Sequence, residues 1–135
     1  MNWKKDNINI TDSKENIDID FIVDSLHQTY WAENRPRDVI IKSMENSVLL
    51  SAFEGGKQVG FARIVGDGAT FSWLCDVYVD PKYRGKGIGK FLMQCVNDHP
   101  ATKVRTNILA TKDAHGLYEQ YGYERTEMMR KRNEE

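Results

Sequence analysis

The fold is decided by the stretch VDPKYRGKGIGKFL, residues 79–92, which connects two apolar runs of the chain. It holds three glycines and four cationic side chains. A strand ending at Val79 and a helix beginning near Ile88 would aim unpaired backbone N–H groups, and the positive end of the helix dipole, at one point. Glycine lets an anion approach the backbone closely. The stretch therefore predicts a phosphate cradle; the alternative is a plain strand-to-helix turn with solvated lysines.

Two familiar phosphate-binding loops do not match this stretch. A Walker A loop needs a glycine five residues before the Gly-Lys pair at 89–90 and a hydroxyl residue after it, but the chain has Arg84 and Phe91 there. A dinucleotide-binding fingerprint that starts at Gly85 or Gly87 lacks its last glycine. The cradle, if it binds phosphate, belongs to another class.

Composition predicts one domain, residues 1–135, because the chain has a common domain length and 40% hydrophobic residues. Its 19 Lys and Arg residues nearly balance its 20 Asp and Glu residues, so no global field favours nucleic acid or a membrane as partner. No apolar run is long enough for a signal peptide or a membrane span, which predicts a cytoplasmic protein. Cys75 and Cys95 lack metal-binding spacing, so we expect packed, reduced thiols and no metal site.

Hydrophobic periodicity outside the loop predicts alternating strands and helices. Helical spacing occurs in four segments: residues 19–30, 36–46, 88–98 and 113–122. Strand-like segments are expected at residues 8–13, 47–54, 57–66, 69–79, 103–111 and 123–132. Glycine turns separate the three central ones, which predicts antiparallel hairpins. The order predicts an α/β fold with a mixed, mainly antiparallel sheet flanked by helices on both faces.

One arrangement of the loop residues does match a known family. Arg84, Gly87 and Gly89 form an R-x-x-G-x-G pattern between an apolar strand and a helix, and residues 117–123 read L-Y-x-x-x-G-Y. In these two motifs, and in the order of its elements, nearly the whole chain resembles the GNAT superfamily of N-acetyltransferases. The resemblance implies that family's sheet, acetyl-CoA as cosubstrate and no metal. A homodimer is the usual arrangement in such families.

The resemblance also implies where acetyl-CoA would bind. Its pyrophosphate would lie on the loop residues Arg84, Gly85, Lys86, Gly87, Ile88, Gly89 and Lys90. Its pantetheine arm would pair with the strand edge at Val77, Tyr78 and Val79, in a groove where this strand parts from the one starting near Lys103. Thr111 stands where many members have an asparagine that contacts pantetheine, so that contact is expected to be weaker or water-mediated.

For chemistry, Tyr118 matches a tyrosine that many GNAT enzymes place near the CoA sulfur. A phenol is a weaker acid than a thiol, so hydrogen bonding to the departing thiolate is its expected role. A backbone N–H near Val77 is the expected oxyanion donor. Cys75 stands where related enzymes often have glutamate; Asp76 beside it could orient the amine, take its proton through water, or be structural. His115 is a further candidate base, with an ordinary surface histidine as the alternative.

The acceptor is expected against residues 27–37, which resemble the segment that covers the substrate end of the groove. Its candidate contacts are Tyr30, Trp31, Glu33 and Arg35. Because the set contains one acidic and one basic side chain, it does not indicate whether the acceptor is a polyamine, an aminoglycoside, an amino acid or a protein amine. We expect acetyl transfer to a primary amine, of a small molecule, by direct attack in a ternary complex. The alternatives are acetylation of a protein lysine or N-terminus, and a non-catalytic CoA-binding module.

Overall fold

The computed structural model describes residues 1–133 and contains a six-stranded sheet in the order β1-β2-β3-β4-β5-β6. The strands are β1 (Asn2–Lys5), β2 (Ile8–Thr11), β3 (Val48–Glu54), β4 (Lys57–Gly66), β5 (Phe71–Val79) and β6 (Thr106–Leu109). The helices are α1 (Ile19–His27), α2 (Arg37–Glu45), α3 (Ile88–Asp98) and α4 (His115–Glu119), with short 3-10 turns η1 (Pro81–Tyr83) and η2 (Pro100–Thr102). Neighbouring strands are antiparallel except for β5 and β6, which are parallel.

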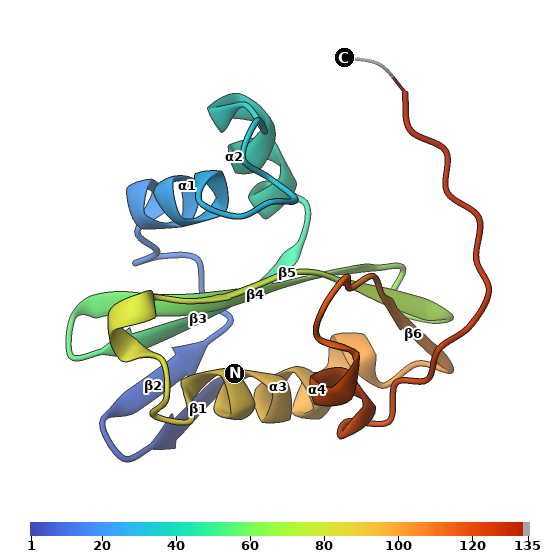
Figure 1. Cartoon of the computed structure of the whole chain (residues 1–135). Helices are drawn as coiled ribbons and strands as arrows, with labels where there is room; N and C mark the ends of the chain where they lie inside the picture. The colour runs from blue at the N-terminus through green and yellow to red at the C-terminus, as the bar shows by residue number, and fades with distance from the viewer. Residues whose placement is uncertain (134–135) are drawn as a thin grey trace.

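Helices cover both faces of the sheet. In Figure 1, α1 and α2 lie above the sheet, while α3 and α4 lie below it. Each face has its own apolar core: α3 buries residues such as Leu92 and Val96 against one face, and α1 and α2 bury Ile22, Leu26 and Ile40 against the other. This arrangement confirms the predicted mixed, mainly antiparallel sheet with helices on both faces. Within residues 1–133, no helix is both long and apolar enough to cross a membrane.

A β-bulge in β5 changes which side chains face which core. Arg63 of β4 lies opposite Asp76, but the next residue, Ile64, lies opposite Leu74, so Cys75 is an extra residue in β5. Before the bulge, Leu74 packs into the core under α3; after it, Tyr78 packs into the core under α1 and α2. Strict alternation would place Leu74, Asp76 and Tyr78 on one face. The bulge instead turns Asp76 and Tyr78 toward α1 and α2.

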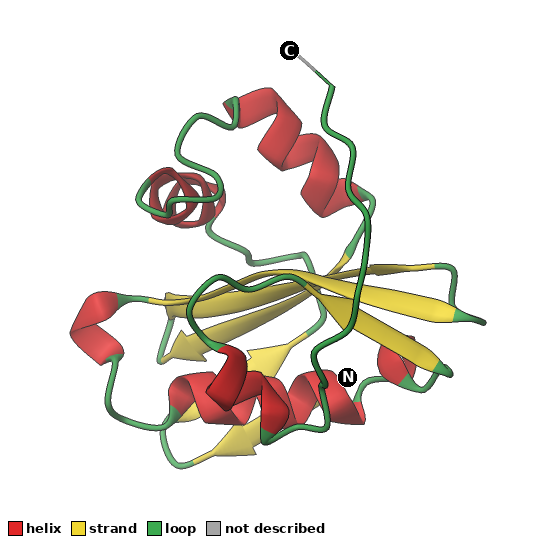
Figure 2. Cartoon of the chain, turned by 45° about the vertical axis from the view of Figure 1, so that its right-hand side comes forward, coloured by secondary structure: helices red, strands yellow, loops and turns green. Residues whose placement is uncertain are grey.

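The two parallel strands separate shortly after the bulge. Pairing between β5 and β6 covers only Phe71–Leu74, opposite Thr106–Leu109. Residues 75–79 of β5 therefore have no strand beside them on that side, and Figure 2 shows the chain after β6 turning away from the sheet. The expected parting of these two strands is present in the structure.

The first strand, β1, was not predicted from the sequence. β1 pairs with β2 through a two-residue turn at Asp6 and Asn7, with Lys5 opposite Ile8. Asp6 has a φ of 53°, in the left-handed region that such hairpin turns require. Asp and Asn tolerate this conformation better than other non-glycine residues. The Asp-Asn pair was thus a usable signal for the hairpin.

The predicted last strand, residues 123–132, is wrong. The helix α4 ends at Glu119, earlier than the predicted 122, and the chain turns at Gly122, which has a φ of 91°. Residues 123–133 pair with no strand of the described chain. A strand needs a ladder of hydrogen bonds with a neighbour, and β-type residue composition alone does not provide one. The segment runs from the β6 side of the sheet toward the level of α2, as a mostly exposed tail (Figure 1).

Candidate functional site

The loop between β5 and α3 is built around two left-handed glycines. Asp80 caps the turn η1 by accepting a hydrogen bond from the Lys82 backbone N–H at 3.0 Å, as expected of a turn residue. Gly85 and Gly87 have φ angles of 80° and 83°, a conformation that other residues adopt at a cost. Gly87 is the N-cap of α3. The glycines therefore bend the chain so that α3 begins facing the end of β5.

The N-terminus of α3 has no side-chain cap. The first N–H groups of a helix have no partner inside the helix, and here Gly87 supplies no oxygen to accept them. By contrast, Asp18 caps α1 by accepting from the Phe21 N–H at 3.0 Å. The free N–H groups and the helix dipole make this end of α3 favourable for a bound anion.

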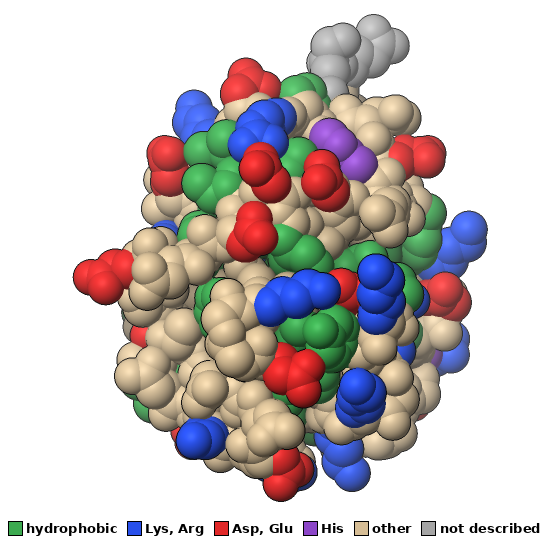
Figure 3. All heavy atoms as spheres, turned by 90° about the vertical axis from the view of Figure 1, so that its left-hand side faces the viewer, with side chains coloured by type: hydrophobic (Ala, Val, Ile, Leu, Met, Phe, Trp, Pro, Cys, Tyr) green, Lys and Arg blue, Asp and Glu red, His purple; other side chains and the backbone are tan. Residues whose placement is uncertain are grey.

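A groove of about 670 Å³, here called the loop groove, lies along these N–H groups. Most of the predicted cofactor residues line it: Val77, Tyr78, Val79, Arg84, Gly85, Gly87, Ile88, Gly89 and Lys90. Lys86 does not; its ammonium lies 5.1 Å from the centre of the Tyr83 ring. Figure 3 views the molecule from this end, and Lys and Arg side chains (blue) lie beside apolar surface (green) near the middle of that face.

The free edge of β5 faces the loop groove. Gly60 lies opposite Val79, and the Asp80 N–H donates to the Val59 carbonyl at 2.8 Å. The alternation of an antiparallel ladder then turns the N–H and C=O groups of Val77 and Val79 away from β4, toward the side where β6 has separated. Arg84 Nε donates a hydrogen bond to the Val79 carbonyl oxygen at 2.9 Å. The backbone groups of Val77 remain available to a ligand at this edge.

A second groove of about 660 Å³ adjoins the first; it is here called the arginine groove because five arginines line it: Arg35, Arg63, Arg84, Arg130 and Arg132. Trp73, Cys75 and Thr111 also line it. Thr111 was predicted as a cofactor contact but lies outside the loop groove, where its hydroxyl accepts from the Ala114 N–H at 3.1 Å. Glu33 is exposed and lines neither groove.

The two grooves share one wall, here called the junction. Six residues line both: Tyr30, Trp31, Val77, Arg84, Asp113 and Tyr118. Tyr30 and Trp31 come from the connection between α1 and α2, whereas Asp113 and Tyr118 come from the segment after β6. Across the junction, the Lys112 ammonium lies 5.3 Å from the centre of the Tyr30 ring. A molecule in one groove would therefore meet a molecule in the other beside Tyr118.

Tyr118 is held as a protonated phenol at the junction. Its ring lies edge-to-face with the Tyr123 ring, with centroids 6.1 Å apart. Burial raises the pKa of Tyr118 above its ordinary value of 10.0, and the neighbouring Tyr30 and Asp113 raise it further. The hydroxyl therefore remains a hydrogen-bond donor at neutral pH.

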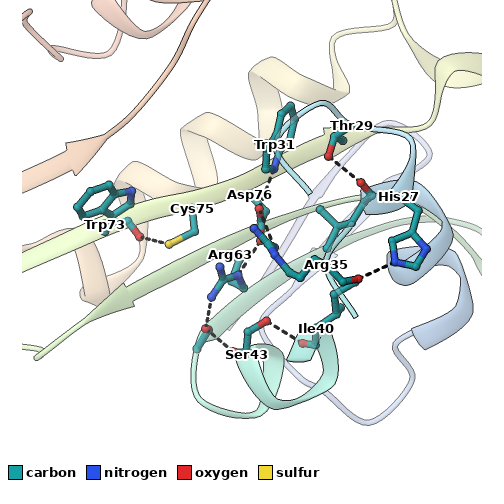
Figure 4. Close-up of polar contacts among 12 residues, drawn as sticks. His27, Thr29, Trp31, Arg35, Ile40, Ser43, Arg63, Trp73, Cys75 and Asp76 are labelled. Carbon is teal, nitrogen blue, oxygen red and sulfur yellow. Dashed lines mark hydrogen bonds and ion pairs between the residues drawn. The ribbon is translucent and has the colours of Figure 1, made fainter. Parts of the chain in front are cut away.

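Asp76 lies beneath the junction and is 1% exposed. Its carboxylate accepts from Trp31 Nε1 at 2.9 Å, from Arg63 Nε at 2.7 Å and from Arg35 Nη1 at 3.2 Å (Figure 4). The His27 ring donates to the Arg35 carbonyl at 2.8 Å, which fixes the backbone of the α1–α2 connection. Asp76 thus joins Trp31 and Arg35, two of the expected acceptor contacts, to the sheet.

The other candidate bases lie differently. Cys75, at the bulge, points away from Asp76, with its sulfur 3.5 Å from the Trp73 carbonyl oxygen (Figure 4). Burial raises the pKa of the Cys75 thiol, so it stays neutral. His115 lines neither the loop groove nor the arginine groove. Among residues 1–133, no group of three or more His, Cys, Asp or Glu could hold a metal ion.

Arg63, Asp113 and the tail arginines Arg130 and Arg132 were not predicted as site residues from the sequence. Arg63 alternates with apolar residues in β4, and only its register opposite Asp76 gives it a role. Asp113 precedes a helix, where aspartate is common as a cap, so its place at the junction has no distinctive sequence signal. Arg130 and Arg132 fall in the segment that was expected to be a strand.

Comparison with known proteins agrees with this geometry. Residues 45–125, which include the loop, β5 and Tyr118, match the family described as Acetyltransferase (GNAT) domain. The chain belongs to the GNAT acetyltransferase family. Members of this family generally use acetyl-CoA.

Several proteins of other organisms resemble this chain in sequence and in structure. A structure from Xanthomonas campestris pv. campestris, described as a candidate GNAT-family acetyltransferase, shares 36% identity and a TM-score of 0.89, covering 95% of both chains. A GNAT-family acetyltransferase of Streptococcus pneumoniae shares 25% identity and a TM-score of 0.70, covering 94% of this chain and 98% of that one. A candidate acetyltransferase of Gibberella zeae is 25% identical, covering 73% of this chain and 67% of that protein.

Acetyl-CoA fits the residues of the loop groove. The uncapped end of α3 and the left-handed glycines suit a pyrophosphate. The free edge at Val77 offers an N–H and a carbonyl to an amide-containing arm, as a strand edge does in β-augmentation. The GNAT cosubstrate would therefore lie with its phosphates at α3 and its thioester toward the junction.

We expect Gly87→Asp to weaken CoA binding by about 10- to 100-fold, because the added carboxylate would repel phosphate at the helix N-terminus. Gly68→Asp is a matched control: its φ is 74°, and a Cβ there also meets nothing within 4 Å, but it lies in the β4–β5 turn. Titration calorimetry with CoA measures both. Equal CoA affinities in the two variants would show that the loop is not part of the CoA-binding site.

We expect Asp76→Asn to lower the free energy of unfolding by about 2 to 4 kcal/mol, because it leaves two partly buried guanidinium groups without their counter-charge. Asp20→Asn breaks the exposed pair with Arg37 and should cost less than about 1 kcal/mol. Urea denaturation gives both values. A loss no larger in Asp76→Asn than in Asp20→Asn would show that the buried cluster does not stabilise the fold.

Proposed function

We propose that this chain transfers the acetyl group of acetyl-CoA to the primary amine of a small molecule, by direct attack in a ternary complex. The observation that carries the proposal is the junction, where the loop groove and the arginine groove share one wall that includes Val77 and Tyr118. Holding two reactants against one wall supplies much of the acceleration of such a reaction. A groove of about 660 Å³ is also the size of a small-molecule site.

When bound, acetyl-CoA would supply an activated thioester. The Val77 N–H, which faces the free edge of β5, would donate to the carbonyl oxygen of the acetyl group as negative charge develops there. A donor fixed in a strand needs little reorganisation during the reaction. The Tyr118 hydroxyl would donate to the sulfur as the carbon–sulfur bond breaks. Its raised pKa favours this hydrogen bond over full proton transfer.

The acceptor must lose a proton to become a nucleophile. Asp113 is exposed and is the acidic residue that lines the junction, so it can accept that proton directly or through water. Asp76 cannot reach the amine in the same way, because it is buried and its oxygens already accept from Trp31, Arg35 and Arg63. We assign Asp76 as a positioning residue that holds the acceptor wall.

The proposed activity can be tested by following thiol release from acetyl-CoA over a panel of small amines and lysine-containing peptides, with calorimetric CoA binding in parallel. We expect CoA binding together with turnover on small amines. Turnover confined to the peptides would instead support a protein acetyltransferase. CoA binding without turnover on any amine would support a non-catalytic CoA-binding module.

Tyr118→Phe tests the proposed chemistry, because it removes the hydroxyl and keeps the ring that packs on Tyr123. A hydrogen bond made mainly in the transition state lowers kcat when it is lost. We expect kcat to fall by about 10- to 1,000-fold, with the KM for acetyl-CoA changed by less than about threefold. Because its pKa lies above 10.0, Tyr118 should cause no loss of kcat as pH rises through neutral and mildly alkaline values.

Tyr121→Phe is the control for this variant, since Tyr121 lines neither groove. A similar loss of kcat in both variants would indicate a general packing effect. Full activity in Tyr118→Phe would mean that water, not Tyr118, assists the departing thiolate.

A further inference from the structure

The arginine groove carries an excess of positive charge. Five arginines line it, and Asp113 is the acidic residue among its lining. Arg35 and Arg63 form its floor with Asp76, and their side chains are only 24% and 13% exposed. Two guanidinium groups share this one carboxylate, so the cluster has a net charge of +1. Partly buried charge without a counter-ion is unfavourable, and an anion entering the groove would compensate it.

The two arginines also keep free donors. Arg63 uses Nε for Asp76 and Nη1 for Ser47, while Arg35 uses Nη1 for Asp76. Among the hydrogen bonds of residues 1–133, Arg35 Nε and the Nη2 atoms of both arginines have no acceptor. None of these nitrogens is fully buried. Among residues 1–133, Ser51 Oγ is the only fully buried side-chain nitrogen or oxygen that lacks a hydrogen-bond partner. These N–H groups therefore have no acceptor in the described chain and keep some solvent exposure.

The phosphates of the cosubstrate do not account for this charge. Arg35 and Arg63 line the arginine groove but not the loop groove, where the uncapped end of α3 lies. Both guanidinium groups are also held by Asp76 before any ligand binds, and that of Arg63 is held further by Ser47 (Figure 4). Donors fixed in advance lose little freedom on binding.

We propose that the acceptor is an amine that also carries a carboxylate, and that Arg35 and Arg63 bind this carboxylate while the amine faces Asp113 and Tyr118 at the junction. This inference rests on the proposed acetyl transfer and names its substrate class. A carboxylate has one negative charge, equal to the excess on the cluster, and two oxygens in a plane that suit guanidinium donors. A cationic polyamine would meet the arginines as a like charge and is therefore disfavoured as the acceptor.

The test compares matched acceptors. Thiol release is measured with a series of ω-amino acids of increasing length, with the primary amides of the same compounds and with alkylamines of the same length. We expect kcat/KM for the best amino acid to exceed that of its amide by about 10- to 100-fold, the contribution of charged hydrogen bonds. Equal or better turnover of the amides would overturn the inference while leaving the acetyl transfer in place.

Arg35→Gln tests whether Arg35 is responsible for the preference for the carboxylate. Within this variant, we expect the ratio of kcat/KM for amino acid to amide to fall toward one, and a ratio within one variant is insensitive to general loss of active protein. Arg37→Gln is the matched control, because Arg37 is exposed and lines neither groove. An unchanged ratio in Arg35→Gln would overturn the assignment. Greater turnover of ω-aminoalkyl phosphates than of the amino acids would mean that the acceptor carries a phosphate and not a carboxylate.

Calorimetry separates this inference from the proposed function. If no amine is acetylated, acetyl transfer fails, but binding of the amino acids to the CoA-loaded protein can still be measured. Binding that is lost with the amides and in Arg35→Gln would support the carboxylate site without catalysis. Equal binding of amino acid and amide would overturn it.

Discussion

The site depends on one extra residue in one strand. Without the bulge at Cys75, the alternation of β5 would keep Asp76 on the same face as Leu74, in the apolar core under α3, where a carboxylate would have no cationic partner. With the bulge, Asp76 lies opposite Arg63 on the face covered by α1 and α2. The bulge also lies where β5 loses β6 as a neighbour. A single local irregularity therefore places the charged cluster beneath the arginine groove and marks the start of the free strand edge along the loop groove.

The buried cluster around Asp76 connects three parts of the chain. The carboxylate receives hydrogen bonds from β4 through Arg63 and from the α1–α2 connection through Trp31 and Arg35. Such clusters are weak evidence for stability, because desolvation of the charges offsets much of their attraction. These bonds nevertheless join the α1–α2 connection to one place over the sheet. In this chain the cluster gives a loop, which is usually mobile, a defined place above the junction.

Much of the fold followed from the sequence, because glycine turns, apolar periodicity and the loop at residues 79–92 are local signals. The loop predicted an uncapped helix N-terminus, and the structure has one at Gly87. The place of Asp76 could not be predicted, because a bulge is a matter of register between two strands and leaves no mark on the alternation of β5 alone. Arg63 and Asp113 were missed for a similar reason, since only packing brings them to the grooves. The expected strand at 123–132 failed because strand-forming residues there have no neighbour to pair with in this chain.

The contact between Lys112 and Tyr30 spans the junction from one side to the other. An exposed cation–π contact contributes about 0.5 to 1 kcal/mol, so thermal motion separates the two side chains in an appreciable fraction of molecules at any moment. Molecules that enter or leave between the α1–α2 connection and the segment after β6 pass this contact. Its strength is too small to control how fast they exchange.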